Sequence, residues 1–189
     1  QRLGFTGEKI ILFVGRIEPL KGIDQLLKAM PYLPISKGLK LVIIGGDENS
    51  QHEMGSLQAL SRHLHVESSV TFLGLIKHEQ MPYFYSAADA SVVSSYYESF
   101  GLSALESLAC GTPVVATDVG ALKDIIRQGE MGYVVTDNSP HLLADKIALL
   151  LLRPSLDMET ASSIRASVSR FSWTNITEAI VTELQMVLD

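Results

Sequence analysis

Six short runs of apolar and mostly β-branched residues recur along the first three quarters of the chain. Each run is nearly continuous in its apolar residues, whereas a half-exposed strand would alternate apolar and polar positions. A continuous run is typical of a strand that is covered on both faces, as in a parallel sheet. The pattern therefore predicts buried parallel strands at residues 9–15, 39–46, 69–74, 90–95, 112–118 and 132–135.

Segments with apolar residues three or four positions apart lie between these runs and predict amphipathic helices. Examples are Ile23, Leu26, Leu27 and Met30. Strand and helix alternate about six times with short glycine-containing joints, which favours right-handed crossovers. The sequence thus predicts an α/β, doubly wound, mostly parallel six-stranded sheet with helices on both faces.

The pattern changes after residue 137, where the strands stop and extra C-terminal helices follow. Pro140 and Pro154 are expected to begin or end helices, because proline lacks the N–H group that a helix interior needs. The last helical run places five apolar residues on one stripe: Trp173, Ile176, Ile180, Leu184 and Val187. Such a stripe has to be covered, either by this domain or by a neighbour outside the chain, and we expect the first.

Composition narrows the class of partner and compartment. The net charge is −6 with no run of Lys or Arg, so nucleic acid is not an expected partner. The chain lacks a stretch of about 18 consecutive apolar residues, and residues 1–9 resemble a linker leading into a strand and not a secretory signal. The single cysteine, Cys110, rules out an internal disulfide and agrees with a cytoplasmic location.

In an open parallel sheet, ligands bind beyond the carboxyl ends of the strands, where helix N-termini face the crevice. The joint after the first predicted strand, residues 15–22, offers Gly15 for close backbone approach and Arg16 and Lys21 as cations before a helix. Two cations at a helix start suit a diphosphate. The alternative is a solvated loop with an ion pair between Arg16 and Glu18.

Two further joints are weaker signals. Residues 45–55 are polar and contain Gly46, which permits close approach of a ligand, but they match neither GxxxxGK[ST] nor GxGxxG. Residues 73–82 place the backbone of Leu75 and Ile76 where it can meet a flat base.

The fourth joint reads ESFGLSALE, residues 98–106. Glu98 is expected on a loop, and Gly101–Cys110 as a helix whose first amides, from Gly101 to Ser103, can bind an anion. Glu106 lies roughly 7 Å along the helix axis from Gly101, so the two carboxylates address different parts of one elongated ligand. A sugar, a diphosphate and a ribose fit that order.

The alternative for this joint is that Glu98 only favours the helix start electrostatically and that Glu106 is solvated. Glu106 lies on an otherwise apolar helix, so we expect its carboxylate to be hydrogen-bonded or to face a ligand cavity. The helix should end at Gly111 as a left-handed cap, which makes Cys110 a small core residue and not a nucleophile. Gly120 and the amides after it are expected to add to the same crevice.

Taken together, GRIEPLKG, the two acids of ESFGLSALE and LACGTPVVATDVGALKDII resemble the C-terminal half of a retaining glycosyltransferase of family four (group 1), which has the GT-B fold with Rossmann-like halves. The resemblance runs over nearly the whole chain. It implies that residues 1–189 are a nucleotide-sugar donor-binding domain and that the N-terminal acceptor domain is absent from this chain.

The resemblance also implies a role for each residue of the site. Arg16 and Lys21 would hold the donor diphosphate and stabilise the leaving group, and Glu98 would position a hexose-type sugar. Glu106 would bind the ribose hydroxyls. The backbone of Ser99, Phe100, Gly101 and Leu102 would contact sugar and phosphate.

The family needs no cofactor and no bound metal, and the HLH motif of His63 and His65 lacks a third ligand. The expected partners are the nucleotide-diphosphate-sugar and the protein's own N-terminal domain, with peripheral membrane association only through that other half. The isolated chain should bind donor weakly and transfer little. Alternatives are a non-catalytic nucleotide-binding or interaction domain, a GT-B nucleotide-sugar epimerase and an α-glucan phosphorylase, although no lysine context favours the last.

Overall fold

The computed structural model describes residues 7–34, 38–154 and 157–188, and this part of the chain forms one six-stranded sheet. The strand order is β3-β2-β1-β4-β5-β6, and every neighbouring pair is parallel. The strands are β1 (Lys9–Val14), β2 (Leu39–Ile44), β3 (Val70–Gly74), β4 (Ala90–Val93), β5 (Val114–Thr117) and β6 (Gly132–Val135). The predicted doubly wound fold and all six predicted strands are confirmed. Residues 1–6 of the predicted linker lie outside the described residues.

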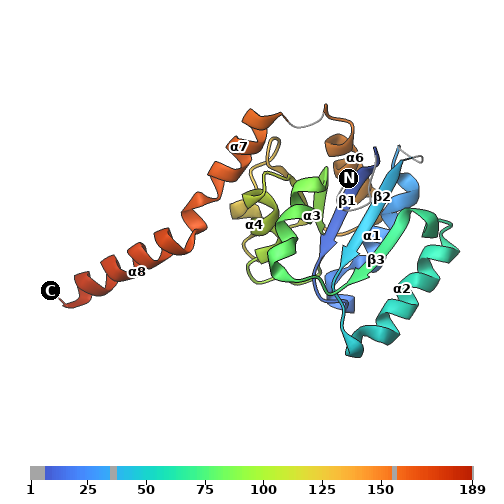
Figure 1. The fold of residues 1–189 in the computed structure, drawn as a ribbon, viewed down its shortest axis with the longest axis horizontal. Helices are drawn as coiled ribbons and strands as arrows, with labels where there is room; N and C mark the ends of the chain where they lie inside the picture. Colours follow the sequence, from blue (N-terminus) through green and yellow to red (C-terminus); the bar gives the residue numbers. More distant parts are fainter. Residues whose placement is uncertain (1–6, 35–37, 155–156, 189) are drawn as a thin grey trace.

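Helices cover both faces of the sheet (Figure 1). One face packs on α1 (Ile23–Ala29), α2 (Gln51–His63) and α6 (Pro140–Leu151). The opposite face packs on α3 (Met81–Ala87), α4 (Leu102–Ala109), α5 (Leu122–Ile125) and α7 (Met158–Ser167). Successive residues of β1 alternate between the two cores, with Ile11 and Phe13 on one side and Ile10 and Leu12 on the other. Coverage on both faces explains why the strands read as continuous apolar runs.

The winding of the sheet reverses between β1 and β4. The chain runs from β1 to β2 and β3 on one side, and then from β4 to β5 and β6 on the other. The helices that follow β1 and β4, α1 and α4, therefore lie on opposite faces of the sheet, which leaves a crevice at the carboxyl edge of these two strands.

Helix α2 begins inside a segment predicted as a loop. Residues 45–55 were expected to be a polar joint, but α2 starts at Gln51 after the short 3-10 turn η3 (Glu48–Ser50). Asp47 accepts from the Asn49 amide, and the Ser50 hydroxyl accepts from the Asp47 amide. This reciprocal cap satisfies free amides and starts a helix despite the low hydrophobicity of its first turn.

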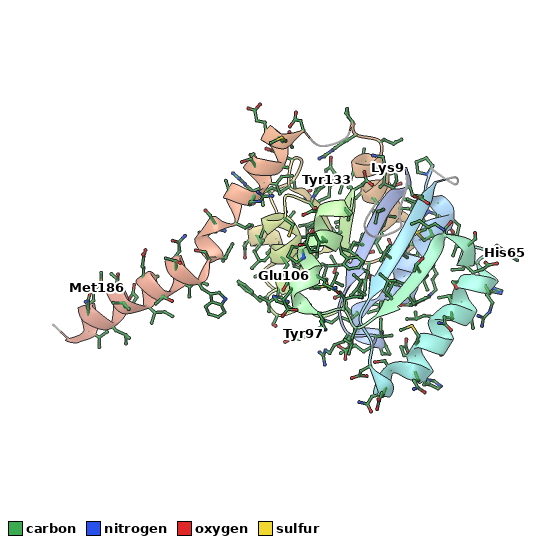
Figure 2. The ribbon with its side chains drawn as sticks, viewed as in Figure 1. Lys9, His65, Tyr97, Glu106, Tyr133 and Met186 are labelled. Atoms are coloured by element: carbon green, nitrogen blue, oxygen red, sulfur yellow. The ribbon has the colours of Figure 1, made fainter. Side chains whose placement is uncertain are left out.

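The C-terminal helices follow the prolines as predicted, because α6 begins at Pro140 and ends three residues before Pro154. The expectation for the last helix is wrong. Helix α8 (Trp173–Leu188) follows the turn η6 (Ser169–Phe171) and extends away from the sheet, with Met186 far from the body (Figures 1 and 2). Trp173 is 84% exposed and Val187 82% exposed, so this domain does not cover the apolar stripe. Among the described residues, no helix combines the length and apolarity that crossing a membrane requires.

Removal of residues 173–189 should leave the fold almost unchanged, because α8 packs mainly on η6. We expect the free energy of unfolding to change by less than about 0.5 kcal/mol in urea melts. The control Leu27→Ala removes a fully buried side chain and should cost about 2–5 kcal/mol. The truncated chain should also self-associate less in analytical ultracentrifugation. A truncation as costly as Leu27→Ala would show that α8 belongs to the core.

Candidate functional site

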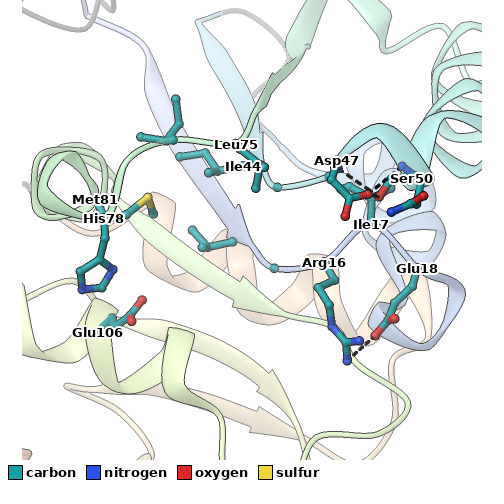
Figure 3. Close-up of a pocket in the computed structure, with 16 residues that line it drawn as sticks. Arg16, Ile17, Glu18, Ile44, Asp47, Ser50, Leu75, His78, Met81 and Glu106 are labelled. Carbon is teal, nitrogen blue, oxygen red and sulfur yellow. Dashed lines mark hydrogen bonds and ion pairs between the residues drawn. The ribbon is translucent and has the colours of Figure 1, made fainter.

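Two adjoining hollows lie at the carboxyl edge of the sheet. The first has a volume of about 570 Å³ and lies at the ends of β1 and β2 (Figure 3). The second has a volume of about 300 Å³ and lies between the ends of β1 and β4. Val14, Gly15, Arg16 and Glu106 line both hollows, so the two form one elongated crevice at the reversal of the winding.

Every residue that the sequence analysis assigns to the site, except Gly120, lines this crevice. The first hollow contains Gly15, Arg16, Gly46, Leu75, Ile76 and Glu106. The second contains Gly15, Arg16, Lys21, Glu98, Ser99, Phe100, Gly101, Leu102 and Glu106. Residues from four different joints are thereby brought together, which is the arrangement that a single elongated ligand requires.

The loop between β1 and α1 is hydrogen-bonded to the segment that follows β4. The Ser94 hydroxyl donates to the Lys21 carbonyl at 3.0 Å, and the Tyr96 amide donates to the Leu20 carbonyl at 2.9 Å. Gly22 has a φ of 61°, and a Cβ there would collide with the Ser94 carbonyl, which also accepts from the Asn138 side chain. Only glycine permits this approach, which fixes Lys21 beside the second hollow.

Lys21 and Glu98 form an ion pair in the second hollow. The Lys21 Nζ to Glu98 Oε2 distance is 2.8 Å, and the two side chains are only 16% and 18% exposed. This pair was not anticipated, because the sequence analysis assigned each residue separately to a ligand. Its low exposure limits screening by water and makes Lys21 the better shielded of the two site cations.

Arg16 is arranged differently. Its guanidinium contacts Glu18 at 3.0 Å, and its side chain is 80% exposed at the mouth of the crevice (Figure 3). The ion pair proposed as the alternative for this loop therefore exists, although Arg16 also lines both hollows. An ion pair this exposed contributes little to stability, so the guanidinium can exchange Glu18 for another anion at low cost.

Helix α4 presents free amides to the second hollow. It begins after Gly101 with no side-chain cap. Among the described residues, the first amide at this end to donate to a backbone carbonyl is that of Ala104, which bonds Gly101 O at 3.0 Å. The amides of Gly101, Leu102 and Ser103 thus have no backbone acceptor, and the positive end of the helix dipole points at this hollow. The predicted cap at the other end is confirmed, because Gly111 has a φ of 81°.

Tyr85 on α3 holds the Glu106 carboxylate. Its hydroxyl donates to Glu106 Oε2 at 2.7 Å, so the hydrogen bond expected for Glu106 is confirmed. Burial, and then the nearby Glu106 carboxylate, raise the pKa of the Tyr85 phenol far above its usual value of 10.0. The phenol therefore stays a donor at neutral pH, and it leaves the other carboxylate oxygen of Glu106 available to the crevice.

Gly120 contributes in a way that was not expected. It lines neither hollow; instead a Cβ at Gly120 would collide with the carbonyl of Glu98 and lie 2.5 Å from that of Ser99. Its φ of 56° is in the left-handed region. Gly120 therefore packs closely against the backbone of the loop that carries Glu98. It does not donate amides to the crevice.

Several residues of the site went unrecognised in the sequence, namely Tyr85, Asn138, His78 and Ser95. Tyr85 fitted the apolar face of its helix, although a buried phenol usually needs a partner, and that need was the available signal. His78 lines the first hollow and faces Glu106 in Figure 3. Asn138 reaches the site only through the Ser94 carbonyl, so no local pattern indicates it.

The remaining candidates, His63, His65 and Cys110, line neither hollow. His63 and His65 are exposed, and the described residues contain no group of three or more His, Cys, Asp or Glu placed to hold a metal ion. Cys110 is half-buried against the core of α3, and burial raises the pKa of its thiol. A protonated thiol is a poor nucleophile, in agreement with the predicted packing role.

Comparison with known proteins identifies the family. Residues 1–166 match the profile of the family described as "Glycosyl transferases group 1". The chain belongs to this family. A relative, the D-inositol 3-phosphate glycosyltransferase of Acidothermus cellulolyticus, is 41% identical over 178 residues, which cover 91% of this chain and 40% of that protein. The chain thus spans less than half the length of the curated relatives that it matches.

Solved structures of similar proteins share the fold. Sucrose-phosphate synthase from Thermosynechococcus elongatus has a TM-score of 0.88 and 33% identity, and the match covers 99% of this chain and 47% of that one. The Anabaena protein HepE, solved in complex with UDP, has a TM-score of 0.88 and 26% identity, covering 98% and 50% of the two chains. Together with the sheet topology, these likenesses show that the group 1 chain described here is a Rossmann-like part of a GT-B fold.

The raised pKa of Tyr85 predicts a loss of stability at alkaline pH. Below pH 10 the phenol is protonated in both the folded and the unfolded chain, so the stabilisation is fully present. Above pH 10 the unfolded chain releases a proton that the folded chain retains, and unfolding is favoured. The free energy of unfolding of wild type should fall more steeply than that of Tyr85→Phe, by up to about 1.4 kcal/mol per pH unit, in urea melts between pH 8 and 11. Parallel slopes would contradict the shift.

The support of the Glu98 loop by Gly120 can be tested with a pair of alanine substitutions. Gly120→Ala should destabilise the fold by more than about 1 kcal/mol, because both the left-handed φ and the contact with Glu98 O oppose a Cβ. Gly55→Ala, in the interior of α2 with open space around it, should stabilise by about 0.5–1 kcal/mol. Thermal melts measure both changes. Equal effects of the two substitutions would show that Gly120 bears no such contact.

Proposed function

We propose that this chain is the donor-binding domain of a retaining glycosyltransferase that transfers a hexose-type sugar from a nucleotide-diphosphate-sugar. The observation that carries the proposal is the convergence of Lys21, Glu98, Glu106 and the free amides of α4 on one crevice at the reversal of the sheet. Cations and amides suit a diphosphate, and carboxylates suit the hydroxyl groups on either side of it.

The first hollow suits the nucleoside. Apolar side chains form much of its wall, including Ile17, Ile44 and Met81, which can pack on a flat base. Its charged side chains are Arg16 and the carboxylates of Glu18, Asp47 and Glu106, so the balance disfavours a phosphate there and favours an uncharged group. Glu106, held by Tyr85, is placed to accept from the ribose hydroxyls.

The diphosphate is assigned to the boundary of the two hollows and to the second hollow. Arg16 lines both, and Lys21 and the α4 amides line the second. When the glycosidic bond breaks, negative charge grows on the leaving diphosphate, and these donors stabilise it. The phosphate would share the Lys21 ammonium with Glu98, which keeps the carboxylate oriented toward the sugar hydroxyls.

The remainder of the reaction is assigned to the rest of the protein. The acceptor and any acceptor-side base would come from an N-terminal domain, which agrees with a chain that spans about 40% of its curated relatives. HepE, whose structures contain UDP and UDP-glucose, supports a nucleotide-sugar donor by its similarity. On this proposal the 189-residue chain alone binds a donor weakly and transfers little.

The proposal predicts unequal roles for the two cations. Lys21→Ala should weaken binding of a nucleoside diphosphate by roughly 10- to 100-fold, because a hydrogen bond to a shielded charge contributes about 1.5–3 kcal/mol. Arg16→Ala should cost only about 2- to 5-fold, because its exposed charge is screened. Calorimetry with UDP, GDP and ADP, and with the matching nucleosides, measures both effects.

The matched control is Arg62→Ala, an exposed arginine on α2 that lines neither hollow. It should bind like wild type, and no variant should lose nucleoside binding by more than about 2-fold. Equal losses for nucleoside and diphosphate would contradict the diphosphate assignment. Binding of none of the three nucleotides would favour an interaction domain, and turnover of a nucleotide-sugar without any acceptor would favour an epimerase.

A further inference from the structure

Ser95 is a buried residue with an unused hydrogen-bonding group in the second hollow. It is 1% exposed. In the chain it lies between Ser94, which bonds the Lys21 carbonyl, and Glu98, which pairs with the Lys21 side chain. Among the described residues, buried side-chain polar atoms without a hydrogen-bond partner are the hydroxyl oxygens of Ser95 and Ser91. A buried hydroxyl without a partner costs free energy, so its presence calls for a physical reason.

The neighbours of Ser95 do not supply that reason. The Ser94 hydroxyl is engaged by the Lys21 carbonyl, and the Ser95 carbonyl accepts from the Thr117 hydroxyl at 2.6 Å. The backbone around Ser95 is therefore held on both sides, while its hydroxyl alone is unpaired. Because Ser95 also lines the second hollow, the partner of this hydroxyl can come from a ligand there.

The chemistry of the second hollow indicates the kind of ligand atom. Lys21 and the α4 amides are donors without acceptor capacity, and they surround the same space as Ser95. Donors that converge in this way suit an anionic oxygen, and the two carboxylates of the lining already have partners, Glu98 in Lys21 and Glu106 in Tyr85. The end of β4, with Val92 and Val93, lines the hollow beside Ser95, so the site lies at the edge of the sheet.

We propose that the Ser95 hydroxyl donates a hydrogen bond to a phosphate oxygen of the bound diphosphate, on the sugar side of Lys21. This inference rests on the proposed function and adds a specific side-chain contact to it. The free protein tolerates an unpaired hydroxyl, and the ligand recovers that cost on binding. Ser95 therefore discriminates a diphosphate from a nucleoside.

The test compares Ser95→Ala with Ser91→Ala. Ser91 lies on β4, four residues before Ser95, and is equally buried and equally unpaired, but it lines neither hollow. Both substitutions remove an unpaired buried hydroxyl, so the thermal midpoint of each variant should equal or exceed that of wild type. Ser95→Ala should bind the preferred of UDP, GDP and ADP roughly 10-fold or more weakly, and the matching nucleoside within about 2-fold of wild type. Ser91→Ala should bind both like wild type.

Each other outcome overturns the inference. Unchanged diphosphate binding by Ser95→Ala would show that the hydroxyl makes no such contact. An equal loss in Ser91→Ala would assign the effect to repacking of β4. A loss seen with a nucleotide-sugar but not with the diphosphate would assign Ser95 to the sugar. If wild type binds none of the three nucleotides, the proposed function itself fails. If wild type binds a nucleotide and the Ser95 variant binds it equally well, only the inference about Ser95 fails.

Discussion

The site depends on the docking of the β1–α1 loop against the segment after β4. These two segments leave the sheet in opposite directions, so the crevice between them would be wide if nothing joined them. Hydrogen bonds from Ser94 and Tyr96 to the loop, and the glycine at position 22, bring the backbones into contact. This contact places a cation from one half of the sheet 2.8 Å from a carboxylate of the other half. The ion pair follows from this backbone packing, because the hydrogen bonds and Gly22 fix the backbone from which the Lys21 side chain extends.

Burial determines how strongly each charged side chain of the crevice can interact with a ligand. The Lys21 and Glu98 side chains are shielded from water, whereas Arg16 is largely solvated. At the same distance, Lys21 therefore attracts an anion more strongly than Arg16 does. Glu106 is oriented by a phenol that burial keeps protonated. The acids are thus held by neutral or compensated partners, and the free donors of α4 and Ser95 remain for an anion. A ligand with an uncharged, an anionic and a polyol segment matches this order along the crevice.

Much of the fold was predictable because its causes are local in the sequence. Continuous apolar runs indicate strands with two covered faces, and the left-handed cap at Gly111 follows from its place before Pro113. The acids of residues 98–106 and the cations of residues 15–22 were predictable as site residues because parallel strands bring all their carboxyl ends to one edge. The partners of these residues were not predictable. The pairs Lys21 with Glu98 and Tyr85 with Glu106 join residues 77 and 21 positions apart, and only the packing of the layers sets them.

Helix α8 shows where a correct local pattern leads to a wrong tertiary conclusion. The stripe was identified from its spacing, and the requirement that it be covered follows from the hydrophobic effect. The pattern contains no information on which surface covers it, and packing on the same domain is merely the commoner solution. An isolated helix of 16 residues is marginal in water, so an α8 that projects with Trp173 and Val187 exposed needs contacts from outside the described residues. The exposed stripe therefore marks α8 as the part of the fold whose stability depends most on a surface that the described residues do not provide.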